Sequence, residues 1–133
     1  MRVVVLEPGY CPYIAIFKSA EDAFRIIKGN HNISLPFDND VIALVDSCEQ
    51  SDMPHNRCIN ESRSVNGRAL ICGWNGTAVC GLTKDQADRY YRRYLYPEKV
   101  EEGPVGMMVI PSMTPRVKPI DERYGKKPNW LER

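Results

Sequence analysis

Residues 2–17 read RVVVLEPGYCPYIAIF. Residues 3–6 are continuously apolar and residues 13–17 form a second β-type run, whereas the two prolines and the glycine between them cannot continue a central strand. The simplest pairing of the two runs is therefore an antiparallel hairpin. Because the apolar core begins at residue 3, we expect no leader peptide and a protein of the host-cell cytoplasm.

Composition narrows the class of protein. The chain has 133 residues, of which 43% are hydrophobic and 26% charged, and this suits one domain with a single core. Eighteen basic and seventeen acidic residues leave a net charge of +1, so no overall field attracts nucleic acid or an anionic membrane. No apolar run approaches the roughly eighteen residues of a membrane span. The five cysteines and two histidines lack zinc-site spacing, so we expect no metal and no cofactor.

Turn and cap residues place the remaining elements. Ser19 is suited to cap a helix that stops near Gly29, and Thr83 with Gln86 forms the capping box of a second helix that runs to Pro97. Two further hairpins are predicted, over 32–45 and over 69–82, and the polar stretch 46–67 between them is predicted to be a long loop. The expected fold is α+β: a mixed or antiparallel sheet of five or six strands with two helices packed on it, spanning residues 1–96.

Residues 97–133 differ in character from the rest. Six of the ten prolines lie there, so regular helix is disfavoured, and only residues 107–110 resemble a strand. We expect an extended C-terminal arm that wraps its own domain, a second copy of the chain or another partner. The candidate partner-binding residues are Arg93, Arg116, Lys118, Tyr124, Lys126, Lys127 and Trp130, and Arg93 is included because it has no acidic residue four positions before it on its helix.

Five short motifs occur in a distinctive order along the chain. They are Leu6-Glu7-Pro8-Gly9 followed by Pro12-Tyr13, then Leu35-Pro36-Phe37-Asp38, Pro54 with Asn56-Arg57, the strand end at Gly73, and Leu82-Thr83. In this order they resemble an uncharacterised family of small domains found in phages, plasmids and conjugative elements of gut Firmicutes. The resemblance covers residues 1–96. It implies a mobile-element origin and no established activity.

Catalysis is the least favoured class of function. The sequence contains no phosphate-binding loop, nucleophile elbow or zinc-protease motif, and Cys58 three residues after His55 does not specify a geometry. We expect a protein that is not an enzyme. A small anionic ligand or nucleotide is an alternative, with a binding site built from Glu7, Tyr13, His55, Asn56 and Arg57. The same Asn56 and Arg57 could instead tie the long loop to Glu7 or to backbone carbonyls.

The leading hypothesis is a small accessory protein that binds a macromolecule and inhibits it. A host protein, in particular one of a host defence system, is the expected partner, by analogy with other mobile-element proteins. Nucleic acid ranks second because the net charge is close to zero. The sequence also leaves open a second copy of the chain as the partner, in a homodimer.

Overall fold

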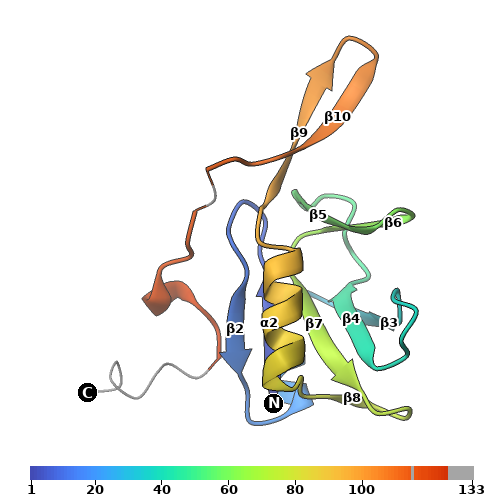
Figure 1. Cartoon of the computed structure of the whole chain (residues 1–133), viewed down its shortest axis with the longest axis vertical. Helices are drawn as coiled ribbons and strands as arrows, with labels where there is room; N and C mark the ends of the chain where they lie inside the picture. The colour runs from blue at the N-terminus through green and yellow to red at the C-terminus, as the bar shows by residue number, and fades with distance from the viewer. Residues whose placement is uncertain (115, 126–133) are drawn as a thin grey trace.

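The computed structural model describes residues 1–114 and 116–125. Its main sheet has six strands, all antiparallel, in the order β2-β1-β7-β4-β3 with β8 paired to β7 (Figure 1). The strands are β1 (Arg2–Leu6), β2 (Tyr13–Ile16), β3 (His31–Ser34), β4 (Ile42–Ser47), β7 (Ala69–Trp74) and β8 (Val79–Cys80). The three predicted hairpins are confirmed, including the first, in which Val3 lies opposite Ala15.

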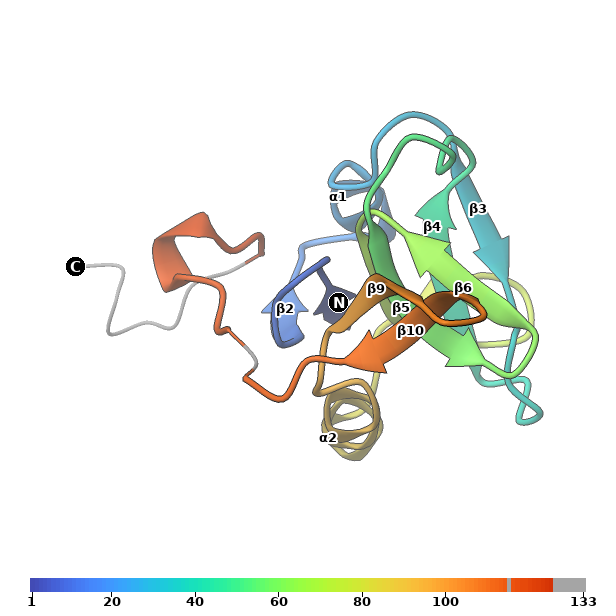
Figure 2. The same cartoon turned by 90° about the horizontal axis from the view of Figure 1, so that it is seen from above.

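Both faces of the sheet are covered, and this explains the unbroken apolar run of β1. Val4 and Leu6 belong to one core cluster and Val3 and Val5 to another, because successive residues of a strand point to opposite faces. Helix α1 (Ala20–Phe24) packs on the second cluster and α2 (Lys84–Arg93) on the first, so the two helices lie on opposite sides of the sheet (Figure 2). The predicted α+β class and the two packed helices are confirmed.

The helices begin where predicted and end earlier. Ser19 accepts a hydrogen bond from the backbone of Asp22, and Thr83 and Gln86 form the expected capping box. The first helix ends at Phe24 because the following residues form tighter turns, with Ile27 N donating to Phe24 O at 3.0 Å. Within α2, Tyr90 is buried against the sheet.

The prediction of a long loop over residues 46–67 is wrong, because part of this stretch forms a second, two-stranded sheet. Strands β5 (His55–Asn60) and β6 (Arg63–Asn66) pair antiparallel and pack beside α2 on the same face of the main sheet. Ile59 and Val65 are the apolar residues that this hairpin contributes to the core. Its other residues are largely polar, so the sequence carries little strand signal here.

The expected extended arm also differs in its described part. Strands β9 (Glu98–Gly103) and β10 (Gly106–Pro111) form a hairpin that projects from the domain (Figure 1). The chain then returns alongside β2 through a short 3₁₀ turn, η1 (Ile120–Glu122). At its end, a Cβ added to Gly125 would lie 2.7 Å from the Cβ of Ala15, so the segment packs closely on its own domain.

One cluster of buried core residues ends at Tyr94 and the other at Cys72, so neither includes a residue beyond Tyr94. The hairpin and the returning segment are therefore additions to a core that residues 3–94 already complete. No helix in the described part of the chain has the length and apolar character needed to cross a membrane.

Candidate functional site

Arg57 is buried inside the domain and binds the backbone. Its side chain is 1% exposed, and its Nε donates to Tyr94 O at 2.8 Å. Nη1 donates to Glu7 O at 3.1 Å and to Asn56 Oδ1 at 2.7 Å, and Nη2 donates to Tyr10 O. Burial lowers the pKa of the guanidinium from 12.5 to about 10. Four of the five guanidinium N–H donors are thus bonded within the chain, and the side chain is buried, so Arg57 is not placed to bind an anion from solvent.

Asn56 is buried with Arg57 and also binds backbone oxygens. Its Nδ2 donates to Leu6 O at 2.8 Å and to Gly67 O at 2.6 Å. The two side chains thus hold β5 against β1 and the end of α2, which is the structural alternative that the sequence left open. Neither residue lies on a loop, since both are in β5.

Glu7 is buried and contacts Tyr13, another of the predicted ligand residues. It is 3% exposed, its Oε1 is 2.5 Å from Arg68 Nε, and its Oε2 accepts a hydrogen bond from Tyr13 Oη at 3.3 Å. Lys118 of the returning segment places its Nζ 3.4 Å from the same Oε2. The backbone N–H of Tyr124 donates to Tyr13 Oη at 3.3 Å. Burial, more than any charge nearby, raises the pKa of Tyr13.

The structure therefore joins two sets of predicted residues that the sequence assigned to different partners. The expected ligand residues Glu7 and Tyr13 are covered by Lys118 and Tyr124, which the sequence assigned to an external partner. Arg116 likewise stacks on its own domain, with its guanidinium carbon 4.7 Å from the centre of the Tyr10 ring. The remaining candidates, Lys126, Lys127 and Trp130, lie outside the described residues.

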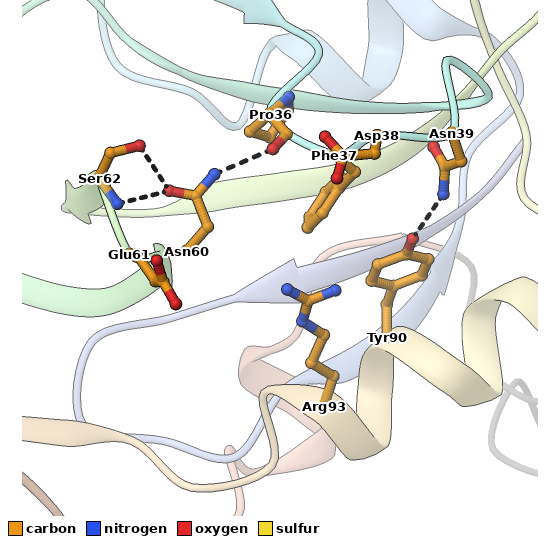
Figure 3. Close-up of a pocket in the computed structure, with 9 residues that line it drawn as sticks. All are labelled: Pro36, Phe37, Asp38, Asn39, Asn60, Glu61, Ser62, Tyr90 and Arg93. Atoms are coloured by element: carbon orange, nitrogen blue, oxygen red, sulfur yellow. Dashed lines mark hydrogen bonds between the residues drawn. The ribbon is translucent and has the colours of Figure 1, made fainter.

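Arg93 borders a pocket of about 560 Å³ (Figure 3). The pocket is bounded by the turn before β4, the β5–β6 turn and α2, and its lining residues are Pro36, Phe37, Asp38, Asn39, Asn60, Glu61, Ser62, Tyr90 and Arg93. The guanidinium carbon of Arg93 lies 4.9 Å from the centre of the Phe37 ring. It makes no ion pair with any residue that the structure describes, in agreement with its lack of a helical partner in the sequence.

Hydrogen bonds fix the two walls of this pocket. Asn39 Nδ2 donates to Tyr90 Oη at 3.1 Å, and Asn60 Nδ2 donates to Pro36 O at 2.9 Å (Figure 3). The pocket offers one guanidinium, two carboxylates, and amide and hydroxyl groups, a mixture suited to a polar ligand. Apart from Arg93, the sequence did not identify these residues, because they come from three separate elements.

The β9–β10 hairpin exposes apolar side chains to an unusual degree. The exposed fractions are 96% for Val105, 68% for Met107, 47% for Val109, 42% for Met108 and 40% for Val100. Strand β10 contains no charged residue, and its outer edge pairs with no other strand of the described chain. Strand β9 carries three glutamates and one lysine. The sequence indicated β10 but not β9, although Pro104 and Gly106 fit a turn between two strands.

One group of metal-binding side chains lies at the base of this hairpin. His55 and Cys58 of β5 meet Glu98, the first residue of β9, and the nitrogen, sulfur and oxygen ligand atoms lie within 4.8 Å of one another. His55 was expected from the sequence to bind an anion. Its Nε2 instead lies 2.9 Å from Glu98 Oε1.

Comparison with known proteins gives one match. Residues 1–95 match the model of a family described as a domain of unknown function (DUF3846). No curated protein and no solved structure matches the chain.

Proposed function

Because the chain belongs to the DUF3846 family, whose function is unknown, we propose a role from its own geometry: it is a protein-binding module that captures a partner protein through the β9–β10 hairpin. The match over residues 1–95 ends just before this hairpin, so the proposed contact surface lies outside the part of the chain that matches the family model.

The exposed apolar surface of the hairpin carries the proposal. A two-stranded hairpin is at best marginally stable in water, and large exposed apolar side chains are commonly covered by another molecule. Met107, Val109 and Val100 point to the same face of the hairpin, since Met107 lies opposite Glu102 and Val109 lies opposite Val100. Glu102 lies on this face as well, so the partner would cover the face with apolar side chains and one basic residue.

The edge of β10 favours a partner that adds a strand. Natural edge strands are protected by charges, bulges or covering segments, and β10 has no charge along its length. An extended partner segment can pair with such an edge through its backbone. Glu101 and Glu102 on the neighbouring strand favour basic residues beside the apolar segment of the partner.

Like the hypothesis from the sequence, this proposal describes a binding protein that is not an enzyme. It differs in the contact surface, which is the β9–β10 hairpin instead of the C-terminal arm. A protein of a host defence system is the partner class that we propose to test first. The proposal does not depend on the basic residues of the returning segment, because Arg116 and Lys118 already contact the domain.

The test compares the wild-type chain with a double variant, Met107→Glu with Val109→Glu, in cells that naturally carry the gene. A photo-crosslinking amino acid at Val105 records the captured protein, because this side chain is 96% exposed at the tip. We expect one major crosslinked protein with the wild type and its loss in the double variant. Met113→Glu is the matched control, since Met113 is 82% exposed but lies outside the hairpin.

Two outcomes would contradict the proposal. One is equal crosslinking of the wild type and the double variant. The other is a purified wild-type protein that is dimeric by light scattering while the double variant is monomeric, since the hairpin would then bind a second copy of the chain.

A small polar ligand in the Arg93 pocket is a second candidate function. It is favoured by a guanidinium that has no ion-pair partner among the described residues and that faces a pocket of about 560 Å³. Nucleotides and dicarboxylates should raise the melting temperature of the wild type but not of Arg93→Gln. Arg89→Gln, on the same helix outside this pocket, is the control. A compound that stabilises all three proteins equally would rule the pocket out as its site.

A further inference from the structure

The position of His55 and Cys58 depends on an irregularity in β5. Residues three apart in a regular strand point to opposite faces. Between His55 and Arg57 the register with β6 shifts, since His55 pairs with Asn66 and Arg57 pairs with Val65. Two residues of β5 therefore oppose one residue of β6, as in a β-bulge. The bulge turns Asn56 and Arg57 both inward and leaves His55 and Cys58 together on the side that faces β9.

Glu98 completes the group from the neighbouring hairpin. Its Oε1 accepts a hydrogen bond from the backbone N–H of Cys58 at 2.8 Å and lies 2.9 Å from His55 Nε2. The side chains of His55 and Glu98 are only 16% and 18% exposed, whereas Cys58 is exposed. The carboxylate is thus held in place by both other residues, and the group opens to solvent on the cysteine side.

We propose that His55, Cys58 and Glu98 form a binding site for a divalent transition metal ion, with Zn²⁺ as the preferred ion. An imidazole nitrogen, a thiolate sulfur and a carboxylate oxygen form a donor set typical of Zn²⁺. Mg²⁺ and Ca²⁺ prefer oxygen ligands alone, so this set selects against them. Three protein ligands leave a fourth position of a tetrahedral ion for water or for a side chain of a bound partner.

The geometry is compatible with such an ion after a small adjustment. Ligand atoms of a tetrahedral zinc site lie about 3.3–3.8 Å from one another, as bond lengths of about 2.0–2.3 Å require. In this structure the three ligand atoms lie within 4.8 Å of one another, and the nitrogen and oxygen are 2.9 Å apart. Because Cys58 is exposed, rotation of its side chain can bring the sulfur inward.

A cysteine nucleophile activated by His55 is the competing interpretation of the same residues. An activated cysteine needs its sulfur within hydrogen-bond reach of the base. Among the described residues, His55 Nε2 instead lies 2.9 Å from Glu98 Oε1, and no hydrogen bond joins His55 to the Cys58 sulfur. A metal site fits the carboxylate better, because a negative charge beside the sulfur opposes a free thiolate and favours a bound cation.

The ion would join β5, which belongs to the domain core, to the first residue of the projecting hairpin. This inference is independent of the partner proposed above, because metal binding is measured on the purified chain alone.

The experiment titrates the full-length, untagged and reduced protein with Co²⁺ and Zn²⁺ after removal of bound metal with EDTA. We expect one Co²⁺ per chain, with the near-ultraviolet absorption of a thiolate-cobalt bond, and displacement of Co²⁺ by Zn²⁺. Cys58→Ser should abolish that absorption and weaken Zn²⁺ binding by about tenfold or more, since even the loss of an indirect neighbour of a metal weakens binding by about 10–100-fold. Glu98→Gln should weaken binding and keep the absorption.

Cys48→Ser is the matched control, because Cys48 is also an exposed free cysteine but does not belong to the group. It should bind both ions like the wild type. Circular dichroism verifies that every variant is folded. The proposal would be overturned by the absence of a thiolate-cobalt band in the wild type, or by equal losses in Cys48→Ser and Cys58→Ser.

Discussion

Replacement of Arg57 by alanine tests whether the buried guanidinium holds the domain together. The change would remove four hydrogen bonds from a side chain that is 1% exposed. Glu7 O would keep its bond from Tyr10 N at 3.2 Å, but Tyr94 O, Tyr10 O and Asn56 Oδ1 would lose the donor recorded for each.

The expected cost follows from these three acceptors. Each buried polar group left without a partner costs about 1–3 kcal/mol, and release of the buried guanidinium charge offsets part of the sum. We expect Arg57→Ala to lower the free energy of unfolding by about 3–5 kcal/mol, a large share of the roughly 5–15 kcal/mol typical of a domain. The measurement is urea unfolding followed by far-ultraviolet circular dichroism and by tryptophan fluorescence.

Two further variants make the result decisive. Arg25→Ala removes an arginine whose side chain is 70% exposed and paired with Glu21 and Asp22, so it should cost less than about 0.5 kcal/mol. Arg57→Lys keeps the charge but cannot reach all four acceptors, so its loss should be intermediate, and it remains measurable if the alanine variant does not fold. A loss below about 1 kcal/mol for Arg57→Ala would refute the structural role.

Three other perturbations have defined outcomes. Burial raises the pKa of Tyr94 from 10.0 to about 12, so the stability contributed by its protonated phenol is complete below pH 10 and is lost as the pH rises towards 12. Urea unfolding between pH 10 and 12 should therefore show a smaller loss of stability with pH for Tyr94→Phe than for the wild type. Equal slopes for the two proteins would contradict the assignment. Thr83→Ala removes the cap of α2 and should lower the free energy of unfolding by about 1 kcal/mol, measured in the same way. Deletion of residues 112–133 should leave a cooperatively folded domain, because neither core cluster includes a residue beyond Tyr94. Glu7 and Tyr13 should become more accessible by hydrogen exchange and chemical labelling, since Lys118 no longer covers Glu7. A truncated chain without a cooperative transition would show that the returning segment belongs to the core.

Local signals in the sequence account for the elements that were predicted correctly. The turn at Asn75-Gly76 and the capping box at Thr83 act over a few residues, so they are visible without knowledge of the fold. Strand β5 is different, because Asn56 and Arg57 hold it by hydrogen bonds to residues that are distant in the chain. A polar strand that is fixed by distant backbone oxygens leaves no alternating apolar pattern to detect.

The candidate sites were likewise only partly predictable from the sequence, because they depend on contacts between distant residues. The sequence selected Glu7 and Arg57 correctly as neighbours, since Arg57 donates to Glu7 O at 3.1 Å, but it could not show that their polar atoms are bonded within the chain. The spacing of His55 and Cys58 did not specify a geometry, and it is the bulge in β5 that brings them to one side. Glu98 was not identified, because its relevance depends on where β9 begins.

The position of β7 between β1 and β4 has a consequence for synthesis on the ribosome. The β1–β2 and β3–β4 hairpins are complete by residue 47, but both pair with β7, whose residues 69–74 emerge later. Until β7 emerges, each hairpin lacks its central neighbour and is at best marginally stable. Closing the sheet then requires contacts between residues that are far apart in sequence. Assembly should therefore be slow and should depend on insertion of this last central strand, which makes the half-synthesised chain a natural client for chaperones.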